Sequence, residues 1–199
     1  MVRPRRCARK AVPATALALA LAASVSACSG DDEPKADPAP AASSAPSAAA
    51  PLETTARLGR VTGRLGRPER ERLRSTIAGV VDAWIDAAYL GDFPRTDFTG
   101  AFPGFTKGAA ADARADGRSM SNERVGARVD DVVAVRREVV VDALATRKRA
   151  VAVTARFVLA MDLEGDVQRT DRVRGRLFLT RSDGAWKVFG YDVDRGVVR

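Results

Sequence analysis

The hydrophobic and polar positions after residue 51 change their period once along the chain. Before Val125 the apolar residues recur every three or four positions, which is typical of helices, and after it they alternate with polar residues, which is typical of strands. Helices followed by a run of strands predict an α+β fold, with N-terminal helices packed on a curved antiparallel sheet. The segment 52–199 has the length of one ordinary domain.

The clearest helix is predicted over residues 68–91. Pro68 suits a first helical turn, Gly91 is a natural C-terminal stop, and the apolar side chains between them lie within one stripe. That stripe comprises Leu73, Ile77, Val80, Val81, Trp84, Ile85 and Ala88. A short, marginal helix is expected over 52–66, where three glycines interrupt the apolar spacing. An Ala-rich helix is expected over 106–116.

Asp82 and Asp86 are four residues apart on the predicted helix. Two carboxylates at this spacing share a helix face, which suits paired acid and base chemistry or a metal ion. Their face points away from the apolar stripe, so we expect both side chains to be solvated.

Strands are predicted over 151–163, 173–180 and 186–193, and 129–135 and 139–145 are strand-like, as one bent strand or two. The face opposite the core carries Val158, Ala160 and Phe178, and Phe189 and Tyr191 lie opposite Trp186 on the last strand. A second partly apolar face favours a protein partner or a dimer. The alternative is that the N-terminal segment of the chain covers it.

Four of the seven phenylalanines lie between Gly91 and Lys107, among prolines and glycines; they are Phe93, Phe98, Phe102 and Phe105. Exposing so much aromatic surface is unfavourable, so the segment must fold back on the protein. Two interpretations follow. The rings are plugs that close one end of the core, or they form, with Trp84, a pocket or a lid over one.

The N-terminus has the layout of a secretory signal peptide. Five basic residues lie in the first ten positions, and the run from Ala11 to Ala27 carries no charge. That run is shorter than the roughly 20 residues of a spanning helix, so a permanent transmembrane anchor is the second interpretation. Residues 28–51 are rich in Ala, Pro and Ser with no large apolar side chain, which predicts a disordered tether.

Val25, Ser26 and Ala27 directly precede Cys28. This motif resembles the lipobox of bacterial lipoprotein precursors, in which an aliphatic residue and two small residues precede an invariant cysteine. The resemblance implies a signal peptide over 1–27, cleavage before Cys28 and a lipid on that cysteine. The expected location is the extracytoplasmic face of the cell membrane.

The end of the chain reads Asp183-Gly184-Ala185-Trp186-Lys187-Val188 before its final strand residues. With the preceding helices and strands, residues 68–195 resemble the nuclear transport factor 2-like cone, the fold of ketosteroid isomerase and polyketide cyclases. The "DGxWKV" close is also similar to accessory proteins of actinobacterial lipid-import systems. The resemblance implies a cone-like, cystatin-like topology, and because this fold hosts enzymes, pocket binders and dimerisation modules it assigns no activity.

Isomerase-like chemistry would need an aspartate base and a tyrosine or protonated aspartate donor in an apolar cavity. Asp142 and Asp192 share strand parity with apolar neighbours, and the tyrosines are Tyr89 and Tyr191. The chain has no histidine, and Cys28 is the one cysteine outside the signal peptide. We therefore assign no catalytic residue, metal or cofactor, although an enzyme using Asp142 or Asp192 stays an alternative.

The full chain has 33 basic and 25 acidic residues, and the signal peptide accounts for much of the difference. With arginines spread among acids, the pattern argues against nucleic-acid binding. The sequence therefore predicts a membrane-anchored extracytoplasmic lipoprotein with a non-catalytic binding or assembly domain. The alternatives are a protein with a pocket for a small apolar ligand or lipid, and an isomerase- or cyclase-type enzyme. Expected partners are the membrane and a second copy or a membrane-complex protein.

Overall fold

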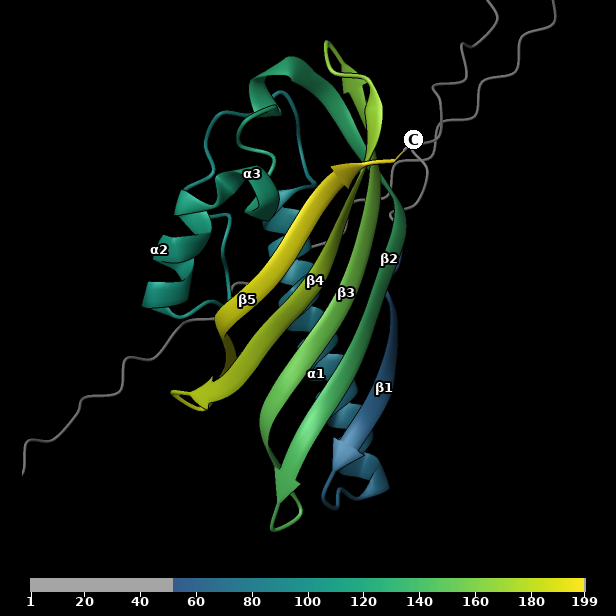
Figure 1. The fold of residues 1–199 in the computed structure, drawn as a ribbon, viewed down its shortest axis with the longest axis vertical. Coiled ribbons are helices and arrows are strands. Elements are labelled where there is room, and N and C mark those ends of the chain that lie inside the picture. The colour runs from purple at the N-terminus through teal and green to yellow at the C-terminus, as the bar shows by residue number, and fades with distance from the viewer. Residues whose placement is uncertain (1–51, 199) are drawn as a thin grey trace, which may run out of the picture. The chain divides into compact units, whose positions relative to one another are not determined.

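A five-stranded mixed sheet with helices on one face makes up residues 52–198, the part of the chain that the computed structural model describes (Figure 1). The elements in chain order are β1 (Thr55–Thr62), α1 (Arg67–Ala88), α2 (Lys107–Ala115), α3 (Gly117–Met120), the 3-10 turn η1 (Gly126–Arg128), β2 (Val129–Thr146), β3 (Arg149–Gly165), β4 (Arg169–Ser182) and β5 (Ala185–Val197). The predicted α+β class is confirmed.

The strands lie in the sheet in sequence order. The last four form an antiparallel meander, in which β2 pairs with β3, β3 with β4, and β4 with β5. The two strand-like segments predicted over 129–145 are one continuous strand, β2, with an irregularity between Ala134 and Arg136.

The expected helix over 52–66 is wrong, because this segment forms strand β1. It runs parallel to β2 with Ala56 opposite Val139, which also makes the sheet mixed rather than antiparallel. The glycines disfavour a helix, and Gly59 lets the strand approach β2 closely: a Cβ there would lie 2.2 Å from a carboxylate oxygen of Asp142. Strand β1 also forms backbone hydrogen bonds with β2, which would otherwise be the edge strand of the sheet.

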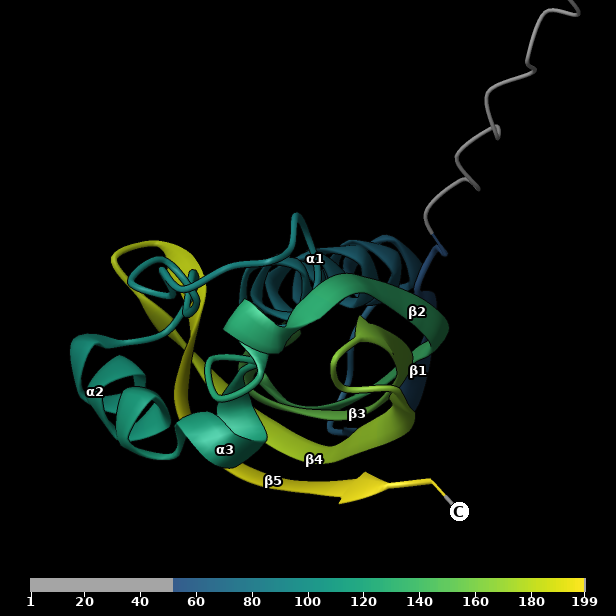
Figure 2. The ribbon, with the colours of Figure 1, turned by 90° about the horizontal axis from the view of Figure 1, so that it is seen from above.

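Helix α1 lies along the concave face of the curved sheet, and α2 and α3 lie beside β5 (Figure 2). The predicted helices over 68–91 and 106–116 are confirmed as α1 and α2. The predicted stripe of α1 is buried against the sheet apart from Val80, which is half-buried. Inward side chains of β2, β3 and β4 complete the core, and the opposite face of these strands carries no helix of the described part.

Gly175 lets β5 approach β4 closely. It lies opposite Val193, and a Cβ added to it would meet the carbonyl oxygen of Asp192 at 2.1 Å. The contact is with backbone, which cannot move aside as a flexible side chain would.

We therefore predict that Gly175→Ala lowers the free energy of unfolding by about 1–3 kcal/mol or more, the cost of overpacking. Gly196→Ala, on the partner strand β5 and with nothing within 4 Å of its added Cβ, is the matched control and is expected to leave stability nearly unchanged. Urea unfolding of both variants measures the difference. Equal midpoints would show that the strands separate at no cost.

Candidate functional site

A cleft of about 840 Å³ opens between α1 and the ends of strands β3, β4 and β5. We call it the apolar cleft. Its larger apolar side chains are Leu65, Leu73, Val80, Val151 and Trp186, and smaller residues and arginines complete the lining. Its volume is within the range of about 300–1,000 Å³ that small-molecule sites occupy.

Helix α1 supplies one wall of the apolar cleft. Glu69, Leu73, Thr76 and Val80 follow one another at spacings of three and four, so they lie on one helix face. The N-terminal half of that face is less closely covered by the sheet than the C-terminal half, where Trp84 and Ile85 are fully buried. The cleft therefore lies next to the core, where the space between α1 and the sheet is open to solvent.

The β4–β5 hairpin supplies the facing wall. Ser182 pairs with Ala185 across a two-residue turn in which Asp183 and Gly184 have φ of 53° and 80°, the left-handed backbone that favours Asp-Gly. This tight turn sets the register that places Trp186 toward the helix. The guanidinium of Arg181 lies 5.2 Å from the centre of the Trp186 ring, a cation–π contact that holds both side chains at the rim.

The polar groups of the apolar cleft are mainly cationic. Arg72, Arg149 and Arg181 line it, and Glu69, the one acid among the described lining residues, is bound by Arg72 at 2.6 Å. A paired carboxylate at an exposed rim is a poor general base. The arrangement suits binding of an apolar group rather than acid–base chemistry.

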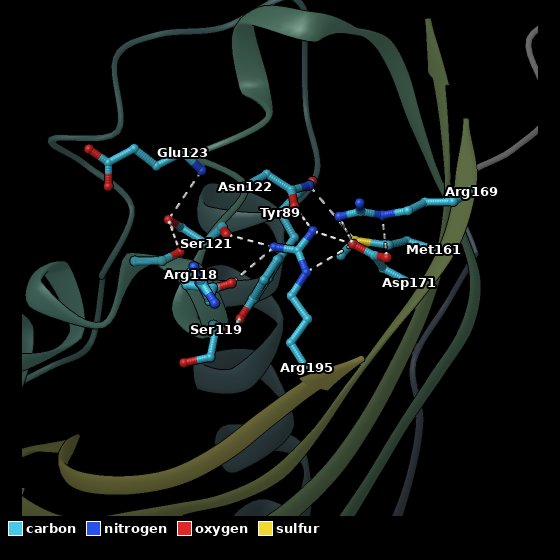
Figure 3. Close-up of polar contacts among 11 residues, drawn as sticks. Tyr89, Arg118, Ser119, Ser121, Asn122, Glu123, Met161, Arg169, Asp171 and Arg195 are labelled. Carbon is cyan, nitrogen blue, oxygen red and sulfur yellow. Dashed lines mark hydrogen bonds and ion pairs between the residues drawn. The ribbon is translucent and has the colours of Figure 1, made fainter. Parts of the chain in front are cut away.

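At the other end of the core, a buried carboxylate joins the last two strands to the helical layer (Figure 3). Asp171 of β4 is fully buried and accepts hydrogen bonds from Arg169 at 2.8 Å and Arg195 at 2.6 Å. Arg195 also donates to the carbonyl of Ser121 at 2.8 Å and to the Asn122 side-chain oxygen at 2.7 Å. Two arginines thus neutralise one acid with four hydrogen bonds, which makes it a poor general base.

Asn122 carries this network on to α1. Its side-chain amide donates to the Tyr89 carbonyl at 2.7 Å, and its backbone amide donates to the Ala88 carbonyl at 2.9 Å, so it satisfies acceptors at the helix C-terminus. The Tyr89 hydroxyl donates to the Ser119 carbonyl. Burial raises the pKa of Tyr89 well above its usual range, and the Arg195 guanidinium only partly offsets this. We call Tyr89, Ser119, Asn122, Asp171 and Arg195 the Asp171 network.

A smaller cleft of about 260 Å³ borders the Asp171 network, and we call it the arginine cleft. Arg118, Arg124, Arg169 and Arg195 line it together with Asp171 and the end of β5. Arg169 and Arg195 are both bound to Asp171, so this cleft is mainly the solvent-facing side of a structural ion pair.

The aromatic residues proposed for a pocket or lid lie in the core. Trp84 is fully buried, with ring centres 5.4 Å from Tyr89, 5.9 Å from Phe105 and 5.1 Å from Phe157. Phe98, Phe102 and Phe105 are buried, and Phe93 is half-buried with Arg95 packed over its ring. The two clefts described above are lined by other side chains.

The two aspartates considered as catalytic bases lie on the outer face of the sheet. Asp142 binds Arg156 at 2.8 Å and accepts the backbone amide of Arg60 at 2.7 Å. Partial burial disfavours its charge, but the hydrogen bonds from Arg156 and Arg60 outweigh this and lower the pKa of Asp142. Asp192 is exposed and pairs with Arg176. Neither carboxylate faces an apolar cavity.

A β-bulge explains why the parity of β5 misleads. Leu179 pairs with Val188 but Phe178 pairs with Gly190, so Phe189 is an extra residue in the strand. Beyond it the two faces exchange: Asp192 points outward, whereas Tyr191 packs toward the core and donates to Asp116 at 2.8 Å. The expectation that Tyr191 lies opposite Trp186 is therefore wrong.

Asp82 and Asp86 are not simply solvated. Arg137, an inward residue of β2 with a buried side chain, binds Asp82 at 3.0 Å and Asp86 at 2.8 Å. It also donates to the hydroxyl of Thr54, which itself donates to Asp82. The paired carboxylates hold an arginine between helix and sheet, and this contact was missed because Arg137 is far away in the sequence.

Val25, Ser26, Ala27 and Cys28 lie outside the described residues. No helix within residues 52–198 is long and apolar enough to cross a membrane. In the same part of the chain, no group of three or more acidic, histidine or cysteine side chains is arranged to hold a metal ion. Comparison with known proteins finds no matching family model, no matching curated protein and no matching solved structure.

The Asp171 network predicts a large difference between two aspartates of the last strand pair. Asp171→Ala leaves Arg195 buried without its carboxylate, so we expect the free energy of unfolding to fall by about 3–5 kcal/mol. Asp194→Ala removes an exposed pair with Arg174 at 3.7 Å and should cost less than about 1 kcal/mol. Chemical denaturation measures both values, and a small effect at Asp171 would contradict its structural role.

Tyr89 predicts a loss of stability in alkaline solution. Its pKa in the folded protein is raised, so its contribution is complete below the ordinary tyrosine value of about 10 and is lost as pH rises above that value. The free energy of unfolding should fall more steeply above pH 10 in the wild type than in Tyr89→Phe, by up to about 1.4 kcal/mol per pH unit. Parallel pH profiles for the two proteins would refute this.

Proposed function

We propose that the protein is a lipid-anchored extracytoplasmic lipoprotein whose domain is a non-catalytic binding module with the apolar cleft as its ligand site. The observation that carries the proposal is the composition of that cleft. Leucine, valine and tryptophan side chains form its walls, and its single acid is paired with an arginine. Such a lining supports binding of an apolar molecule by burial of its surface.

The rest of the chain supports the same interpretation. The acids considered for an isomerase-type enzyme are bound by arginines on the outer face, and the buried Asp171 is held by two arginines. We include in the proposal the cone-like, nuclear transport factor 2-like arrangement that the sequence resembles, which the curved sheet around α1 supports. The lipobox-like motif supports the location of the protein at the membrane.

The anchor is tested by labelling with radioactive palmitate in the bacterial host. Cys28→Ala should abolish incorporation and partitioning into the detergent phase, because the acyl chains are attached through this thiol. Cys7→Ala is the matched control, since Cys7 lies in the segment expected to be removed, and it should leave labelling intact. Labelled Cys28→Ala protein, or an unlabelled wild type, would refute the lipobox assignment.

The ligand site is tested with the mature chain, residues 28–199, carrying Cys28→Ser so that no lipid is attached. The neutral apolar dye N-phenyl-1-naphthylamine should bind with increased fluorescence. Val151→Lys places a charge in the cleft and should weaken binding at least about tenfold, because a desolvated charge is costly. Val135→Lys is the control, a valine of similar exposure outside the lining. Dye binding that is absent, or equally weakened by both variants, would refute the site.

A further inference from the structure

The end of the domain that holds the apolar cleft has a local excess of positive charge. Several basic side chains near this end have no carboxylate within ion-pair distance in residues 52–198, and six of them are considered: Arg64, Arg67, Arg147, Lys148, Arg149 and Arg181. The first two precede and begin α1, Arg147 and Lys148 form the β2–β3 turn, Arg149 begins β3, and Arg181 is the last residue but one of β4. We call this region the basic end.

The acids of the basic end are already neutralised. Glu69 pairs with Arg72 at 2.6 Å, Glu71 with Arg74 at 3.0 Å, and Asp183 with Lys187 at 3.1 Å. Each pair is formed within one helix turn or one hairpin, so the acids bind their own neighbours rather than the six cations. The N-terminus of α1 lies at the same end and adds its positive dipole.

The three segments that carry these cations are far apart in the sequence but lie around the same cleft. Arg149 and Arg181 line the cleft themselves, together with Leu65, which directly follows Arg64. The loop before α1 touches the end of β2, where a Cβ on Gly63 would meet the Ala145 carbonyl at 2.1 Å. Figure 1 shows the β2–β3 turn and the start of α1 at the same end of the sheet.

Charge is separated along the strands. A cleft at the opposite end, beside the β3–β4 turn, is lined by the carboxylates of Asp130, Asp162 and Glu164, with Arg169. On the outer face between the two ends, Asp142, Asp192 and Asp194 each pair with an arginine of a neighbouring strand. Arg149 and Arg181, which form no ion pair within residues 52–198, therefore line the apolar cleft, where the one acid is paired with Arg72. The carboxylates of Asp130, Asp162 and Glu164, which form no ion pair in the same part of the chain, lie at the opposite end.

From this juxtaposition we infer that the apolar cleft takes a single-chain anionic amphiphile, with its chain against Leu73, Val151 and Trp186 and a phosphate or carboxylate head between Arg149 and Arg181. The inference rests on the proposed function and adds the ligand class to it. Guanidinium groups present parallel N–H donors that match both kinds of oxyanion. The cations stand at the rim, so the head keeps partial contact with water while the chain is buried.

The test is displacement of N-phenyl-1-naphthylamine from the mature Cys28→Ser chain by two amphiphiles below their micelle concentrations. Dodecyl phosphate and dodecylphosphocholine have the same chain, but only the first has a net negative head. We expect dodecyl phosphate to displace the dye at a concentration at least about tenfold lower, since one charge-assisted hydrogen bond suffices for that factor. Added salt should reduce the ratio.

The double variant Arg149→Gln, Arg181→Gln should bring the two concentrations to within about twofold. The ratio is measured within each protein, so any change in the apolar contacts cancels. Arg118→Gln, Arg124→Gln is the control, with the same loss of charge at the arginine cleft, and should keep the wild-type ratio.

Each other outcome overturns the inference. A dye that binds but is displaced equally well by both amphiphiles would retain the proposed function and reject the anionic ligand class. A dye that does not bind would reject both. If the control variant lost its preference for dodecyl phosphate, the anionic head would be assigned to the arginine cleft instead. Protein that sediments with anionic lipid vesicles while dodecyl phosphate fails to displace the dye would replace the cleft by a membrane surface contact.

Discussion

The ion pair between Asp171 and Arg195 is the contact on which the arrangement of the helical layer depends. A buried carboxylate is stable only when its charge is balanced and both its oxygens accept hydrogen bonds, and here two arginines do both. Arg195 in turn orders Ser121 and Asn122, and Asn122 caps the carbonyls at the C-terminal end of α1. One charge pair on two strands therefore positions the helix that forms a wall of the apolar cleft.

Arg137 fixes the same helix nearer the edge of the sheet. It is buried on the inner face of β2, where an unpaired guanidinium would be very unfavourable, and its two carboxylate partners project from consecutive turns of α1. With Asp171 at one end and Arg137 at the edge, α1 is held by charges along its C-terminal half. Its N-terminal half makes fewer such contacts, and the cleft opens there.

The sequence was sufficient for elements whose cause is local. The stripe of α1 follows from the spacing of Leu73, Ile77 and Trp84, and the β4–β5 turn follows from the backbone preference of Asp183 and Gly184. Features with distant causes were not predictable. Strand β1 needs the edge of β2, which comes about 80 residues later, and the Asp171 pair joins strands whose charged residues resemble ordinary surface positions.

The bulge at Phe189 shows how one extra residue changes a functional interpretation. Strict alternation along β5 would turn Asp192 inward and Tyr191 outward, which is the placement that an isomerase-like base requires. Because the bulge reverses the two faces, Asp192 joins the ion pairs of the outer face and Tyr191 binds Asp116 beside α2. The same strand keeps Trp186 and Val188, before the bulge, on the inner face.

The apolar cleft therefore combines two features: apolar side chains that are not fully covered, and cations without ion-pair partners among the described residues. On the outer face of the sheet, Arg156, Arg174 and Arg176 each pair with a carboxylate of a neighbouring strand, and most large apolar side chains of the described part are buried in the core. At the cleft, Val80 and Val151 remain partly open to solvent next to Arg149 and Arg181, which have no ion-pair partner within residues 52–198. Burying the apolar side chains and neutralising the cations are both favourable. A ligand that does both at once must be apolar at one end and anionic at the other.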